Sequence, residues 1–176
     1  KFFLSSISKE PIREAKSFAA VPNNDLHSPY AQFILYSLCE DTGNATPKSD
    51  LAPYHCADGG YANTRDGEPS VNATAAALMI QGQNGGYNAS TDVDWLRSEQ
   101  LTSGGFRAER NTPLPDLLST ATALFTLRCY GVEPRYSAAE FIEAHWLDNG
   151  GFAATLMDEE SDVEYLFYGL LALGTL

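Results

Sequence analysis

Two aspartates in matching settings are the first candidates for chemistry. Asp116 and Asp162 each lie 11 positions after the second residue of a Gly-Gly pair and directly precede an apolar, helix-forming segment. An aspartate at this place accepts backbone N–H groups and caps the helix. Helix N-termini that open together onto a ligand site also attract anionic groups there. The sequence therefore leaves two roles open for both residues, a cap and a catalytic carboxylate.

The residues around these aspartates add candidates for ligand binding. Arg107 and Arg110 precede Asp116 in a polar loop, and guanidinium groups bind phosphates and carboxylates unless they are simply solvated. The aromatic residues Tyr165, Phe167 and Tyr168 follow Asp162 on a predicted inner helix. They are candidates for the wall of a cavity, with core packing as the alternative.

A repeat positions all of these residues. A Gly-Gly-aromatic triplet recurs at intervals of 45 and 46 residues, as Gly59-Gly60-Tyr61, Gly104-Gly105-Phe106 and Gly150-Gly151-Phe152. Each triplet is followed by a polar loop and an apolar segment with helical spacing, and these segments begin at Ser70, Asp116 and Asp162. Such regular self-similarity predicts stacked helical units.

Amphipathic segments before the triplets predict a second helix in each unit. They run from Pro47 to Ala57, from Thr91 to Gln100 and from Ser137 to Leu147. Because the apolar segments are hydrophobic nearly all round, we expect them to form an inner layer and the amphipathic ones an outer layer. The sequence thus predicts one all-α domain over residues 1–176, with about four helical hairpins covering approximately 9–43, 47–86, 91–131 and 137–176.

The stretches TSGGFRAERNTPLPDLLSTATALFTL and DNGGFAATLMDEESDVEYLFYGLLALG resemble the C-terminal repeats of protein prenyltransferase beta subunits. More broadly, the repeat resembles that of squalene and terpene cyclases. The resemblance implies an α/α toroid, of which this chain would form a partial or open ring with an uncovered edge at its inner helices. It also implies an isoprenoid or other hydrophobic ligand.

The same resemblance implies where a catalytic zinc and a diphosphate would bind. The family's zinc-ligating Asp is matched by Asp116, but Leu118 stands at the Cys position and Tyr165 at the His position. Among the diphosphate-binding positions, Ser70 replaces a His whereas Arg110 is kept. Because catalytic zinc takes three protein ligands, we predict no metal at this place and no cofactor.

The cyclase branch of the family uses an Asp of a D-x-D-D motif to protonate its substrate. The nearest match is the stretch from Asp92 to Trp95, which lacks the second Asp of the pair and lies on a predicted outer helix. Acidic residues in the first turn of a helix are explained by the helix dipole alone. We therefore expect Asp92 and Asp94 to be structural.

Composition excludes several classes of protein. The 176 residues carry 11 Lys and Arg against 23 Asp and Glu, a net charge of −12 that disfavours nucleic-acid binding. The apolar run from Tyr165 to Leu173 is too short to span a membrane. The scattered His27, His55 and His145 form no metal-binding motif.

The cysteines and sequons bear on localisation. Cys39, Cys56 and Cys129 are scattered, which predicts three buried thiols and favours the cytoplasm. Three N-x-S/T sequons, beginning at Asn44, Asn72 and Asn88, leave secretion open.

Two functional hypotheses follow. The first is a prenyltransferase-like or cyclase-like toroid that lacks zinc-dependent transfer and binds a hydrophobic, isoprenoid-like ligand or a protein partner. That partner would be a further part of the ring, a second copy or another protein. The alternative is an active isoprenoid transferase or cyclase with a diverged, metal-free site.

Overall fold

The protein is described by a computed structural model that covers residues 28–88, 90–148 and 150–176. The first part of the hairpin predicted at approximately 9–43, together with His27, lies outside these ranges. The described helices are α1 (Pro29–Thr42), α2 (Val71–Gly85), α3 (Thr91–Ser98), α4 (Leu117–Cys129), α5 (Ala139–Ala144) and α6 (Val163–Leu173). Strand β1 (Tyr61–Ala62) pairs with β2 (Pro69–Ser70), β3 (Phe106–Arg107) with β4 (Pro115–Asp116), and β5 (Trp146–Leu147) with β6 (Gly151–Phe152).

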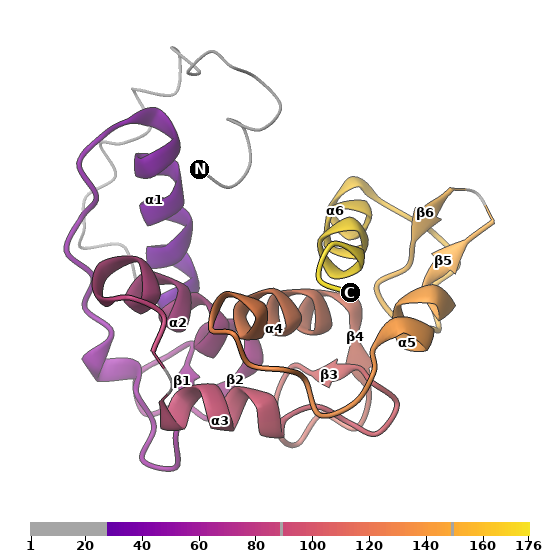
Figure 1. The fold of residues 1–176 in the computed structure, drawn as a ribbon, viewed down its shortest axis with the longest axis horizontal. Helices are drawn as coiled ribbons and strands as arrows, with labels where there is room; N and C mark the ends of the chain where they lie inside the picture. Colours follow the sequence, from indigo (N-terminus) through magenta and orange to yellow (C-terminus); the bar gives the residue numbers. More distant parts are fainter. Residues whose placement is uncertain (1–27, 89, 149) are drawn as a thin grey trace.

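The helices form two layers, as Figure 1 shows. In the inner layer α1 packs on α2, α2 on α4, and α4 on α6. In the outer layer α3 lies against α2 and α4, while α5 lies against α6. The predicted all-α class with inner and outer helices is confirmed, and the short strands only connect the helices.

The outer layer is sparser than predicted. The segment from Pro47 to Ala57 forms a single 3-10 turn (Ala52–Tyr54) in place of a helix. Pro47 at the start of this segment and Pro53 within it explain the loss, since proline cannot donate a helical hydrogen bond. The helix predicted from Ser137 to Leu147 is reduced to α5, and its last two residues become strand β5.

The loops predicted between the glycine pairs and the inner helices are antiparallel strand pairs in two of the repeats. Tyr61 lies opposite Ser70, and Phe106 lies opposite Asp116. The pairing brings each triplet aromatic beside the residue that caps the next inner helix. Two-residue strands are too short to leave a periodic signal in the sequence.

The first glycine of each triplet is fixed by backbone conformation. Gly59, Gly104 and Gly150 have φ angles of 93°, 93° and 89°. Side chains other than that of glycine are strained at these angles, which explains why this residue recurs.

The second glycine is fixed by packing in the first two triplets. A Cβ atom on Gly60 would lie 2.7 Å from Cδ2 of Trp95, and one on Gly105 would lie 2.5 Å from Cε2 of Phe141. Trp95 belongs to α3 and Phe141 to α5. The glycine pair therefore lets an outer-helix aromatic ring rest directly on the turn.

The third member of the triplet joins the turn to the inner helix. The backbone N–H groups of Tyr61 and Phe106 donate to the hydroxyls of Thr74 and Thr120, each over 2.8 Å. Phe106 itself is fully buried, and burial of such a side chain contributes about 1.5–3 kcal/mol. These contacts unite turn, outer helix and inner helix in one core.

The cysteines only partly follow the prediction of three buried thiols. Cys39 is buried, whereas Cys56 and Cys129 are half-buried, and all three are free thiols. Burial raises the pKa of each thiol above its ordinary value. A thiol with a raised pKa is a weak nucleophile at neutral pH.

The last inner helix presents an apolar stripe to solvent. Val163, Leu170 and Leu173 are 85%, 56% and 46% exposed on α6. Their spacing places them on one side of the helix, away from α4, its inner-layer neighbour within the described residues. Among the described helices, α6 therefore has the uncovered edge expected for a partial ring. No helix in the described ranges is long and apolar enough to cross a membrane.

Candidate functional site

A cavity of about 430 Å³ lies along the inner helices. Its size falls in the range of small-molecule sites. The walls are predominantly apolar, and α1, α2, α4 and α6 all contribute to them. The apolar lining residues include Phe33, Ile34, Ala76, Met79 and Phe125.

Pairs of uncharged polar groups interrupt this apolar wall. The Tyr168 side chain of α6 lies near that of Tyr30 on α1. The Thr122 hydroxyl of α4 donates over 3.0 Å to Oδ1 of Asn72 on α2. All four residues line the cavity. Burial, followed by the contact with Tyr30, raises the pKa of Tyr168, so that its hydroxyl stays protonated at neutral pH.

The predicted site residues at the helix starts serve as caps. The Ser70 hydroxyl accepts the N–H of Ala73 over 3.2 Å at the start of α2. Asp162 accepts the N–H of Tyr165 over 2.8 Å at the start of α6. Neither Ser70 nor Asp162 lines the cavity.

Asp116 is engaged twice at the start of α4. One carboxylate oxygen accepts the N–H of Ser119 over 2.7 Å, and the other accepts its hydroxyl over 2.8 Å. The capping role considered for Asp116 and Asp162 is thus confirmed. Catalytic use of either residue stays a prediction.

Removal of the Asp116 cap should weaken the fold modestly. We expect Asp116→Ala to lower the free energy of unfolding by about 0.5–2 kcal/mol, because two donors at the start of α4 lose their acceptor. Urea denaturation followed by circular dichroism measures the change. Asp116→Asn, which keeps an acceptor oxygen, is the matched control and should lose less. Equal stability of the alanine variant and the wild type would contradict the capping role.

The zinc ligand set implied by the family resemblance does not fit this chain. Leu118 offers no donor atom, and both carboxylate oxygens of Asp116 are held by Ser119. Throughout the described ranges, no three His, Cys, Asp or Glu side chains come together as a possible metal site. We therefore derive no chemistry through a metal.

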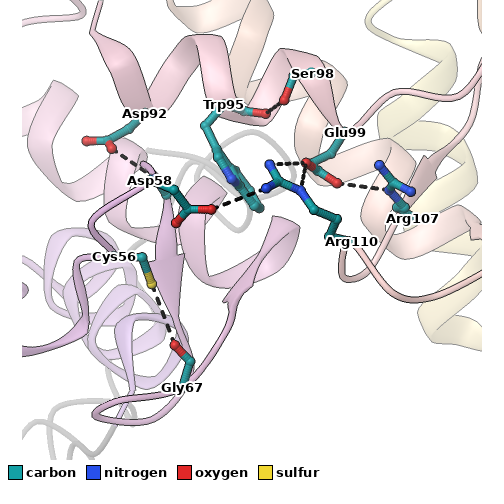
Figure 2. Close-up of polar contacts among 10 residues, drawn as sticks. Cys56, Asp58, Gly67, Asp92, Trp95, Ser98, Glu99, Arg107 and Arg110 are labelled. Atoms are coloured by element: carbon teal, nitrogen blue, oxygen red, sulfur yellow. Dashed lines mark hydrogen bonds and ion pairs between the residues drawn. The ribbon is translucent and has the colours of Figure 1, made fainter.

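The two candidate arginines converge on one buried carboxylate (Figure 2). Glu99, whose side chain is 1% exposed, accepts Nε of Arg107 over 2.9 Å. It also accepts Nε and Nη2 of Arg110 over 3.2 and 3.0 Å. A buried carboxylate requires such compensation. Neither arginine lines the cavity. The sequence left solvation and anion binding open for both, and in the structure both stabilise the Glu99 carboxylate.

Arg110 also links two repeats. Its Nη1 lies 3.2 Å from Oδ2 of Asp58, which belongs to the preceding glycine turn. The guanidinium carbon lies 6.0 Å from the ring centroid of Trp95, at the limit of a cation–π contact. Figure 2 shows Arg110 between Asp58 and Glu99, with Trp95 beside it.

The carboxylate considered for cyclase chemistry lies in the outer layer. Asp92 of α3 is buried and accepts the N–H of Gly60 over 3.0 Å. The same oxygen lies 2.9 Å from Nε2 of His55. The structural role expected for Asp92 and His55 agrees with these contacts, which join α3 to the preceding glycine turn.

His145 is a fully buried histidine at the end of α5. Its Nδ1 lies 2.8 Å from the carbonyl oxygen of Phe141, while Nε2 has no hydrogen-bond partner among the described residues. Burial lowers the pKa of the imidazole below its ordinary value of 6.5, and the Phe141 carbonyl, Asp116 and Asp158 oppose that shift. His145 is therefore neutral in the folded protein at pH 7.

Acidification should destabilise the fold through His145. Below about pH 6.5 the His145 imidazole is protonated in the unfolded chain, whereas in the folded chain burial opposes its protonation. The free energy of unfolding therefore decreases as the pH falls, until the pH reaches the lowered pKa of the folded state. Urea denaturation at pH 7.5 and pH 5.5 measures this loss. It should be smaller in His145→Gln than in the wild type, whereas His55→Gln, a control at a partly exposed histidine, should retain it. The same pH dependence in wild type and His145→Gln would contradict the assignment.

Two of the three aromatic residues considered for a cavity wall, Phe167 and Tyr168, line the cavity. Tyr165 packs against the core at a ring-centroid distance of 6.3 Å from Tyr168 and does not line the cavity. The contribution of α1 was missed. Its Phe33, Ile34 and Ser37 follow an i, i+1, i+4 pattern that the sequence contains but that is equally typical of core packing.

Comparisons with known proteins extend the description of the fold. No protein-family model matches the sequence, and no curated protein matches it. The structure is similar to that of a Candida albicans protein geranylgeranyltransferase-I complexed with GGPP, with a TM-score of 0.62 and 15% sequence identity. The match covers 84% of this chain and 49% of that one, so the chain spans about half the length of its structural neighbour. The likeness shows that the chain shares the fold of the aligned part of that structure.

Proposed function

We propose that this chain binds an elongated apolar molecule of isoprenoid type in the cavity between its inner helices, without zinc-dependent transfer. The observation that carries the proposal is the cavity of about 430 Å³ with walls from α1, α2, α4 and α6. Apolar walls with a few oriented polar groups are typical of small-molecule sites. The neighbour complexed with GGPP supports an isoprenoid as the first class to test.

The binding experiment uses farnesol, geranylgeraniol and the diphosphate of each. We expect at least one of them to bind saturably with one molecule per chain and to raise the melting temperature. A ligand at about 100 times its Kd adds about 2.7 kcal/mol to the free energy of unfolding. Absence of saturable binding by all four compounds would refute the proposed function.

A transfer assay separates binding from catalysis. The chain is incubated with farnesyl or geranylgeranyl diphosphate and candidate acceptor peptides, with and without zinc. We expect no transfer under either condition, because the family's zinc ligand positions hold Leu118 and Tyr165. Turnover that is lost in the Asp116→Ala variant would favour the alternative, an active enzyme with a diverged site.

A further inference from the structure

Among the residues that the structure describes, the cavity wall offers no cation. None of its described lining residues is Lys, Arg or His, and the lining residue with a carboxylate is Asp41. A diphosphate or carboxylate enclosed there would lose hydration without gaining a charged partner, which is unfavourable. The net charge of −12 for the whole chain adds long-range repulsion of anions.

The two arginines considered for anion binding are already neutralised. Arg107 and Arg110 both pair with Glu99, and Arg110 pairs also with Asp58. An anionic ligand that recruited either arginine would take a partner from a carboxylate that is 1% exposed. Leaving a buried carboxylate with fewer partners is costly.

The starts of α2, α4 and α6 offer no substitute for these arginines. At α4 and α6 the N-terminal N–H groups already face the carboxylates of Asp116 and Asp162. A ligand anion beside either cap would meet a like charge. At α2 the cap is the neutral Ser70, which lies outside the cavity wall.

The polar groups that do face the cavity suit an uncharged partner. Tyr30 with Tyr168, and Asn72 with Thr122, present hydroxyl and amide groups on the wall. These groups form hydrogen bonds with an alcohol or a carbonyl group of a ligand, and no charged group is buried when they do so. Resting on the proposed function, we infer that the cavity selects an apolar ligand with an uncharged polar end, such as a long-chain isoprenoid alcohol, over its diphosphate.

Direct comparison of geranylgeraniol with geranylgeranyl diphosphate tests the inference. Both are titrated into the wild-type chain at physiological ionic strength, and we expect the alcohol to bind at least tenfold more tightly. Equal or tighter binding of the diphosphate would overturn the inference while leaving the proposed function intact. Absence of binding by both, and by their farnesyl counterparts, would instead refute the proposed function and the inference with it.

A pair of charge variants tests the cause of the preference. Ile34 lines the cavity on α1 and is 49% exposed, so Ile34→Lys adds a cation at the margin of the site without burying it. We expect this variant to reduce the ratio of the two dissociation constants, that of the diphosphate over that of the alcohol, at least threefold. Val163→Lys adds the same charge at a residue that is 85% exposed on α6 and outside the wall, and it should leave the preference nearly unchanged. Equal effects of the two variants would contradict a local cause.

Discussion

Filling the cavity with one aromatic ring should strongly weaken ligand binding. We expect Ala76→Phe to weaken the tightest-binding isoprenoid more than tenfold, a loss of at least about 1.4 kcal/mol in binding free energy. Ala76 lies on α2, is 4% exposed and lines the cavity. The new ring would therefore occupy space that the ligand needs. Calorimetric titration of variant and wild type measures the difference.

The control for this substitution is Ala139→Phe, the same change at an exposed position on α5 outside the cavity wall. This control should bind as the wild type does. Overpacking costs about 1–3 kcal/mol in a filled core, so the melting temperature of both variants is recorded to show that they are folded. Wild-type affinity in a folded Ala76→Phe chain would show that the ligand binds elsewhere.

Removing both arginines from Glu99 should cause the largest loss of stability. We expect the double substitution of Arg107 and Arg110 by alanine to lower the free energy of unfolding by about 3 kcal/mol. Loss of the partner of a buried charge costs about 3–5 kcal/mol, and the lower end applies because the Arg110 side chain is 51% exposed and well hydrated. Urea denaturation at pH 7 measures the change.

Two further variants identify the source of that loss. Adding Glu99→Gln to the double variant removes the buried charge and should restore part of the lost stability. Arg135→Ala, at an exposed arginine that stacks on Tyr136, should cost less than about 1 kcal/mol. If Glu99→Gln restored nothing, the loss would lie in arginine packing and not in the buried carboxylate.

The inner helices and their caps could be predicted because local rules determine them. The Gly-Gly-aromatic triplets located each turn, and the residues that follow them identified Asp116 and Asp162 as helix starts. A turn that needs a positive φ at Gly104 and close ring packing at Gly105 leaves a strong sequence signal. Because each repeat is determined by such local rules, the layered helical fold could also be predicted from the repeat.

The cavity and the Glu99 cluster could not be predicted, because they depend on tertiary packing. Helix α4 is apolar on every side, so the sequence does not show that Phe125 faces a cavity while Leu127 faces the core. Glu99 meets Arg107 and Arg110 only because the glycine turn folds the loop back onto the end of α3. No helical or strand spacing indicates such a pairing.

The exposed stripe on α6 has a consequence for cooperativity. In a stacked array each helix is stabilised by its neighbours, and a terminal helix receives one such interface where an internal helix receives two. Among the described helices α6 is such a terminus, and it should open locally before α2 or α4. Phe167, Tyr168 and Leu171 of α6 form part of the cavity wall. A ligand in the cavity would pack against α6 as a second neighbour. The stability of this end of the array would then depend on whether the cavity is occupied.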